Sequence, residues 1–160
     1  FLSTTFEYDG SSWTAGGAVG TAVYNFGYAG SQTSALGFSG ENAPTPIATT
    51  QAYDGSSWSS GGNLANARYS VAGAGAANTE ALAFGGASPS DDTQVDVEQY
   101  DGSSWSAQPN LPSGQSSSGA FGTTTNAVSA GGFTPPSSTL TTTFEWSGVG
   151  SEKIEDIDVT

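Results

Sequence analysis

The chain contains no cysteine and no histidine, and only two of its 160 residues are basic. Without cysteine it can form no disulfide bond and offers no thiolate nucleophile. Without histidine it lacks the side chain most often used as a general base and as a metal ligand. Paired carboxylates can hydrolyse glycosides, but no such pair stands out in this sequence. We therefore expect a protein that is not an enzyme and that uses no cofactor.

Basic residues are almost absent, whereas acidic residues number 15, which gives a net charge of −13. No cluster of Lys and Arg is available to replace the counterions of a nucleic acid, so we expect no nucleic-acid partner. No apolar run approaches the roughly 20 residues that cross a bilayer, so we expect no membrane insertion. The chain also lacks methionine and begins at Phe1. We therefore expect a processed product, a fragment or a part of something larger.

One hexapeptide, Tyr-Asp-Gly-Ser-Ser-Trp, occurs three times without change, at residues 8–13, 53–58 and 100–105. Successive copies begin 45 and 47 residues apart, and a degenerate fourth copy begins at Trp146, 46 residues after Tyr100. A period of this length is typical of a repeat architecture in which each repeat forms one small sheet. The repeat therefore indicates how the rest of the chain is organised.

Each repeat contains four short segments with strand character. In the clearest repeat they are residues 69–76, 80–86, 93–100 and 103–107, separated by residues that favour turns. Asp-Gly within the hexapeptide predicts a two-residue hairpin turn between the third and fourth segments, since glycine readily adopts a positive φ. Four strands per 45–47 residues match one blade of a β-propeller.

The order of these features resembles the kelch repeat. In that family a diglycine closes the second strand of a blade, and a Tyr and then a Trp follow it. Here Gly85-Gly86 precedes Tyr100 and Trp105, and Gly131-Gly132 precedes Trp146, which occupies the Tyr position. The resemblance covers essentially the whole chain and implies an all-β fold, a kelch-type β-propeller segment. The Gly/Ser/Thr-rich style is similar to that of kelch-like structural proteins of marine and cyanobacterial phages.

The resemblance divides the chain into about three and a half four-stranded blades. We expect a half blade over residues 1–18 and blades over 19–65, 66–115 and 116–160, with the last strand at 154–160. Propellers usually close with four to eight blades, and an open arc would expose sheet faces and edges. We therefore expect closure by further sequence or by oligomerisation, with further copies of the chain or other chains of a larger assembly as partners.

The repeated residues are interpreted as scaffold. Aromatic side chains that recur in every blade fill the space between adjacent sheets, in preference to stacking on sugars. An Asp beside Gly stabilises its own turn, and diglycines let neighbouring strands approach closely. The expected structural set is Tyr8, Asp9, Gly10, Trp13, Tyr53, Asp54, Gly55, Trp58, Gly85, Gly86, Tyr100, Asp101, Gly102, Trp105, Gly131, Gly132 and Trp146.

The loops between the second and third strands differ from blade to blade. Variable loops on a rigid scaffold are where recognition usually resides, although loops also vary where nothing constrains them. The candidate binding residues are Asn42, Pro44, Pro89, Asp91, Phe133 and Pro135. For Asp91, Asp92 and Asp96 a calcium site is the alternative to solvated loop carboxylates, which are commoner. Arg68 either binds an acidic ligand or serves a local ion pair or carbonyl contacts.

These observations favour a non-enzymatic structural or binding module. The resemblance implies a phage virion or tail-fibre-like appendage that contributes to assembly or to host-surface attachment, with a host glycan or protein as a further partner. The alternative is a secreted or cell-surface adhesion module that binds glycan or protein through its variable loops. Both hypotheses place the chain in a virion or outside the cell.

Overall fold

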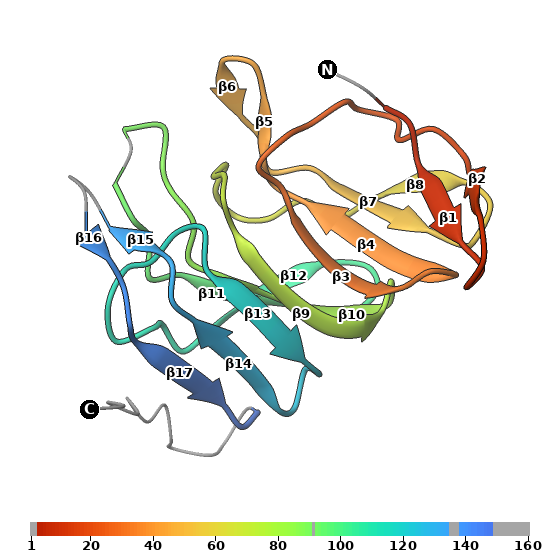
Figure 1. Cartoon of the computed structure of the whole chain (residues 1–160). Coiled ribbons are helices and arrows are strands. Elements are labelled where there is room, and N and C mark those ends of the chain that lie inside the picture. Colours follow the sequence, from red (N-terminus) through yellow and green to blue (C-terminus); the bar gives the residue numbers. More distant parts are fainter. Residues whose placement is uncertain (1–2, 91, 135–137, 149–160) are drawn as a thin grey trace.

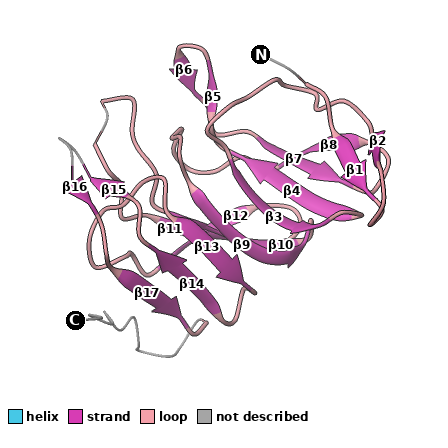
Figure 2. Cartoon of the chain, viewed as in Figure 1, coloured by secondary structure: helices cyan, strands magenta, loops and turns pink. Residues whose placement is uncertain are grey.

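The chain folds into a series of antiparallel sheets that follow one another along the sequence (Figure 1). The computed structural model describes residues 3–90, 92–134 and 138–148, and these residues form strands and loops without a helix (Figure 2). In this described part, therefore, no helix could cross a membrane. The expected all-β fold class is confirmed.

Four sheets account for most of the strands. The first is a hairpin of β1 (Phe6–Tyr8) and β2 (Trp13–Ala15). The strands of the other three are β3 (Gly27–Ser31), β4 (Ser34–Phe38), β7 (Thr50–Tyr53), β8 (Trp58–Gly61), β9 (Ala72–Ala77), β10 (Glu80–Phe84), β11 (Val97–Tyr100), β12 (Trp105–Gln108), β13 (Gly119–Gly122), β14 (Ala127–Ala130) and β17 (Thr143–Trp146). Their orders are β3-β4-β7-β8, β9-β10-β11-β12 and β13-β14-β17. The strand expected at residues 154–160 lies outside the described part.

Two loops that the sequence left irregular contain short hairpins of their own. One pairs β5 (Glu41–Asn42) with β6 (Thr45–Pro46), and the other pairs β15 (Phe133–Thr134) with β16 (Ser138–Thr139). Single bridges from Tyr24 to Glu41 and from Ser116 to Phe133 join the hairpins to the residues that lead into the first strands of their sheets. The loops are therefore braced at their bases.

The equivalent loop of the third sheet shortens two of the expected strands. Ala87 forms bridges with both Tyr69 and Thr93, outside the main sheet. As a result β9 begins at Ala72 and β11 at Val97, although the sequence predicted strands from residues 69 and 93. The residues before each strand brace the loop and do not extend the sheet.

The turn inside the hexapeptide is longer than predicted. Tyr100 pairs with Trp105, so four residues connect β11 to β12, and the two-residue Asp-Gly turn was wrong. Asp101 Oδ1 accepts hydrogen bonds from the N–H groups of Ser103 and Ser104, both at 2.8 Å. The carboxylate thus satisfies backbone donors that the wider turn leaves without a cross-strand partner. The other two copies have the same pairing.

Apolar side chains from neighbouring sheets form two cores. Strand β10 contributes to both, because successive side chains of a strand point to opposite faces. Ala81 and Ala83 face the preceding sheet, whereas Leu82 and Phe84 face the following one. Their partners are Leu36, Phe38 and Tyr100 in one core and Ala127, Phe144 and Trp146 in the other. Small residues on one face and large ones on the other let the sheets stack closely.

A second diglycine, which was not identified from the sequence, lies at or just beyond the end of the fourth strand. A Cβ on Gly17 would overlap the carbonyl oxygen of Ser56, and a Cβ on Gly62 would overlap that of Ser103. The hexapeptide turn of each following repeat therefore rests directly on this backbone. The equivalent residues at the end of β12 are Gln108-Pro109, and the repeat that follows them lacks the Asp-Gly-Ser-Ser turn.

This close approach predicts that Gly62→Ala lowers the free energy of unfolding by about 1–3 kcal/mol, the usual cost of overpacking. The clash is with backbone atoms of the neighbouring turn, which no rotamer change can relieve. Gly119→Ala is the matched control, since nothing lies within 4 Å of a Cβ at that position. Urea denaturation of both variants tests the prediction, and equal midpoints would contradict it.

Candidate functional site

The loops between second and third strands lie on one side of the molecule. Figure 1 shows the β5–β6 and β15–β16 hairpins and the loop after β10 on the side opposite the β9–β10 and β13–β14 turns. Asn42, Pro44 and Pro89 are exposed there, and Phe133 is 36% exposed. Asp91 and Pro135 lie outside the described residues. We call this side the loop face.

Polar contacts hold the loop face in place. Glu41 Oε2 accepts a hydrogen bond from Asn25 Nδ2 at 3.2 Å, and Ser90 Oγ donates to Asp92 Oδ2 at 2.8 Å. A hydroxyl pair, Thr93 and Thr134, connects the loops of the third and last sheets at 3.4 Å. The structure brings Asn42 and Pro44 together in one hairpin, while Phe133 belongs to another. The loop face therefore offers hydroxyl, amide and carboxylate groups on a braced backbone.

The calcium alternative receives no geometric support from the residues that are described. Within that part of the chain, no group of three or more acidic side chains lies close enough together to hold a metal ion. The Asp92 carboxylate instead accepts a hydrogen bond from Ser90. The hydrogen bond of Asp96 is made by its backbone carbonyl, which accepts the Gly85 N–H at 2.9 Å.

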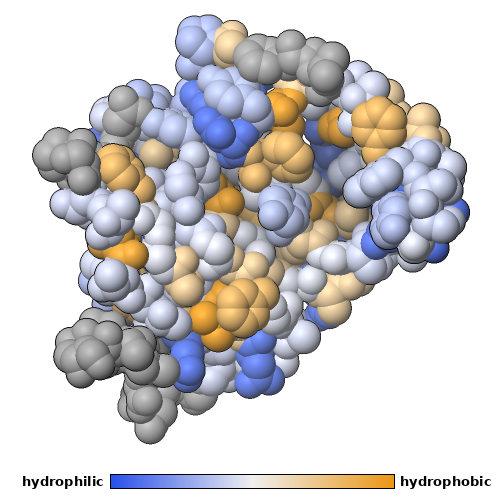
Figure 3. Space-filling view, in the orientation of Figure 1, coloured by the Kyte–Doolittle hydropathy of each residue, from blue (hydrophilic) through white to orange (hydrophobic). Residues whose placement is uncertain are grey.

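An apolar hollow of about 230 Å³ lies beside the first hairpin. Figure 3 shows hydrophobic residues around a hollow on the face of the molecule that it displays. Its apolar lining includes Val19, Val23, Phe26, Phe38 and Trp58. Thr4 and Thr5, which lead into β1, line it as well, so the hollow lies between the first hairpin and the next sheet. The hollow was not predicted from the sequence, but the apolar residues between β2 and β3 that line it were a signal that could have indicated it.

The repeated aromatics connect neighbouring sheets in two of the three copies. Trp58 Nε1 donates to Thr5 Oγ1 of the preceding sheet at 2.9 Å, and Trp105 Nε1 donates to Thr50 Oγ1 at 2.8 Å. Within each hexapeptide the Tyr and Trp rings also contact each other, with centroids 5.0–5.1 Å apart. In these two copies the rings are packing elements, whereas no sheet of the described residues covers the rings of the first copy.

The three turn aspartates have depressed pKa values. Hydrogen bonds from the backbone N–H of Ser57 and from Ser56 lower the pKa of Asp54 to about 2. The equivalent bonds from Ser104 and Ser103 lower the pKa of Asp101 to about 2. Asp9 is shifted in the same direction, first by the backbone N–H of Ser12. Each carboxylate is thus held in its charged form as a turn cap.

These shifts predict an acid-sensitive stability. A carboxyl group whose pKa is lower in the folded state stabilises the fold above its unfolded pKa of about 4, and this contribution is lost as the pH falls towards 2. We expect carboxyl ¹³C chemical shifts of Asp54 and Asp101 to titrate near pH 2. Midpoints near 4 for the turn aspartates would refute the capping role.

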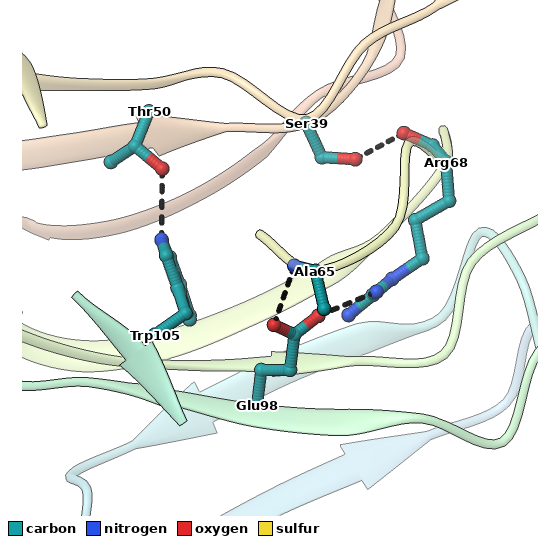
Figure 4. Close-up of polar contacts among 6 residues, drawn as sticks. All are labelled: Ser39, Thr50, Ala65, Arg68, Glu98 and Trp105. Atoms are coloured by element: carbon teal, nitrogen blue, oxygen red, sulfur yellow. Dashed lines mark hydrogen bonds and ion pairs between the residues drawn. The ribbon is translucent and has the colours of Figure 1, made fainter. Parts of the chain in front are cut away.

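Arg68 forms a buried ion pair and not an exposed binding group. Its Nη1 lies 2.7 Å from Glu98 Oε1, and the two side chains are 1% and 5% exposed (Figure 4). The other Glu98 oxygen accepts the N–H of Ala65 at 2.9 Å, and the Arg68 carbonyl accepts the Ser39 hydroxyl. The local interpretation of Arg68 therefore fits the structure, and Glu98, the partner, was not identified from sequence.

Comparison with known proteins shows a likeness in fold alone. A solved structure of a protein named YjhT superposes with a TM-score of 0.79 at 12% sequence identity. The match covers 96% of this chain and 52% of the YjhT chain, so the chain spans about half the length of that protein. No protein-family model matches the sequence. No curated protein sequence matches it either.

Proposed function

We propose that the chain is a non-enzymatic structural and binding module, a kelch-type β-propeller segment of a phage virion or tail-fibre-like appendage. In this role stacked blades form the scaffold, and the loop face contributes to assembly or to attachment to a host-surface glycan or protein. The position of the chain would be in the virion or outside the cell. Further copies of the chain or other chains of the assembly would be its partners.

The observation that supports this proposal is the contrast between stacked turns and loops. The turn of every hexapeptide has the same sequence and the same pairing, and two of the three pack on a neighbouring sheet. The loops on the loop face differ from repeat to repeat in their hairpins and in the side chains that they carry. Bridges nevertheless brace each loop. A rigid scaffold with variable, polar loops on one side is the usual arrangement for recognition.

Binding by the loop face can be tested on a glycan array and on host cells with the purified chain. We expect binding to a defined set of glycans or to a surface protein. The double variant Asn42→Ala/Phe133→Ser should weaken it at least about tenfold, the scale of a lost hot-spot residue. Gln32→Ala, exposed in the β3–β4 turn on the opposite side, is the control. A blank array together with no cell binding would refute the binding role.

The alternative role, a secreted or cell-surface adhesion module, is distinguished by location. It uses the same loop face and differs only in where the protein resides. Immunogold labelling of particles and cells from the source culture separates the two. Label on particles supports the appendage, whereas label confined to the cell surface or medium supports the adhesion module.

A further inference from the structure

The two ends of the series of sheets present open faces. At the first end Tyr8 and Trp13 are 47% and 68% exposed, although the equivalent Tyr53 and Tyr100 are each 2% exposed. Phe6, on the same face, is also largely exposed. We call this surface, formed by Phe6, Tyr8 and Trp13, the head face. At the other end β17 and β14 present Thr143, Glu145 and Val128, which we call the tail face.

Hydrogen bonds between neighbouring repeats follow a rule, and this rule shows which side chains each end face can pair with. Each hexapeptide Trp that has a sheet in front of it donates its indole N–H to a Thr three positions before the Tyr position of that sheet. The observed pairs are Trp58 with Thr5 and Trp105 with Thr50. In the third sheet Val97 occupies this Thr position. The repeat that follows has Ser151 at the sequence position of the Trp. At the junctions between successive repeats of this chain, the Trp donor and the Thr acceptor are therefore either both present or both absent.

When the rule is applied to the two end faces, one donor and one acceptor of the described residues remain. Among the described residues, no sheet lies in front of Trp13 to supply a Thr. Thr143 stands three positions before Trp146, the residue in the Tyr position, and residues 147–160 contain no further copy of the hexapeptide. The missing acceptor at the head face is therefore present at the tail face.

A second pair of side chains gives the same result. The hydroxyl of Tyr53 hydrogen-bonds the carboxylate of Glu7, which directly precedes the Tyr position of the neighbouring sheet. Tyr100 faces a sheet with Ala52 at that position and forms no such bond. The residues at the equivalent positions of the two end faces are Tyr8, whose hydroxyl donates to the Gly10 carbonyl at 2.8 Å, and Glu145 on the tail face.

The tail face also repeats the surface on which the second sheet already packs. Residues 142–145 read Thr-Thr-Phe-Glu, identical to residues 4–7, and the two segments hold the same place in their sheets. A hollow of about 330 Å³, lined among others by Phe121, Val128 and Glu145, lies on this surface. Projecting aromatics at one end therefore match a hollow at the other.

We propose that a second copy of this chain docks head to tail, with the head face of one copy on the tail face of the next. Trp13 then donates to Thr143 of the second copy, as Trp58 does to Thr5. The Tyr8 hydroxyl exchanges its bond to the Gly10 carbonyl for one to Glu145 of that copy, as in the pair of Tyr53 and Glu7. The proposal deepens the partner named under the proposed function and rests on its stacked-sheet scaffold, but it does not depend on binding by the loop face.

Two properties follow from this geometry. The contact joins different surfaces of the two copies, so it produces a closed ring or an open filament and never a face-to-face dimer. Each copy carries a net charge of −13, so the copies repel one another at low ionic strength. We therefore expect self-association to strengthen when salt rises from about 0.01 to 0.15 M and the Debye length falls from about 30 to 8 Å.

Sedimentation velocity over a concentration series tests the association directly. The wild-type chain should form species larger than its 16.0 kDa monomer. Trp13→Ala or Thr143→Glu should each raise the dissociation constant about 30-fold or more, the scale of a lost interface hot spot. Tyr28→Ala is the matched control, an aromatic 72% exposed that belongs to neither end face. Far-UV circular dichroism confirms that every variant is folded, and Glu145→Ala is the milder tail variant.

Mixing the two deficient variants gives the sharpest result. Trp13→Ala keeps an intact tail face and Thr143→Glu keeps an intact head face, so an equimolar mixture should form a 1:1 dimer that neither variant forms alone. A monomeric wild type at 1 mM chain, or a mixture that stays monomeric, would overturn the proposal. If the chain stays monomeric but binds glycans, the head-to-tail contact fails and the proposed binding role stands. The reverse outcome leaves the contact and removes the binding role.

Discussion

Glu98→Ala is expected to lower the free energy of unfolding by about 3–5 kcal/mol, the usual cost of removing one partner of a buried ion pair. The substitution leaves the guanidinium of Arg68, only 1% exposed, without a counter-charge. It also removes the acceptor of the Ala65 N–H. Domains of this size are stable by about 5–15 kcal/mol, so a large part of the stability is at risk. Urea denaturation followed by tryptophan fluorescence measures the loss.

A double-mutant cycle separates the ion pair from other effects of the substitution. Arg68→Met combined with Glu98→Gln removes both charges and keeps an acceptor for Ala65. The Nε and Nη2 atoms of Arg68 already lack hydrogen-bond partners, so an apolar replacement loses few contacts. We expect the double variant to lie within about 1 kcal/mol of the wild type, because buried pairs are often replaceable by apolar groups. A double variant as unstable as Glu98→Ala would contradict this account.

The sequence predicted the sheets well because one motif marks the same place in each repeat. Tyr and Trp of the hexapeptide are paired residues of neighbouring strands, so their spacing located the third and fourth strands of each sheet. The ends of strands were less predictable. Residues 69 and 93 have strand-like neighbours, yet both form bridges to Ala87 in a loop, which is a tertiary choice that local pattern does not encode. The propeller itself, the calcium alternative at Asp91 and the strand at 154–160 stay predictions.

The candidate sites were predictable only in part, for a similar reason. Exposed loop residues such as Asn42 and Pro44 follow from loop composition. Glu98 could not be chosen from 15 acidic residues, because its partner lies 30 positions away in another part of the fold. Three identical hexapeptides also conceal a difference, since the first copy is exposed and the other two are covered. Identity of sequence therefore does not imply identity of environment.

That difference leads to the second large effect. Trp105→Ala is expected to lower the free energy of unfolding by about 3 kcal/mol, because it removes a large aromatic from between two sheets. The Trp105 ring lies 4.9 Å from the ring of Phe38 and 5.1 Å from that of Tyr100, centroid to centroid. Its indole N–H also donates to Thr50. Thr50→Val removes that hydrogen bond alone and should cost about 1 kcal/mol.

Trp13→Ala is the matched control, because Trp13 occupies the same position of an identical hexapeptide. Its side chain is 68% exposed, so at protein concentrations where the chain is monomeric the substitution should change stability by no more than about 0.5 kcal/mol. Thermal and urea denaturation of both variants, at equal and low concentration, gives the comparison. If the two substitutions cost the same, the contribution of the aromatic lies within its own hexapeptide and not between sheets. If only Trp105→Ala is costly, the stacking of one sheet on the next stabilises the fold.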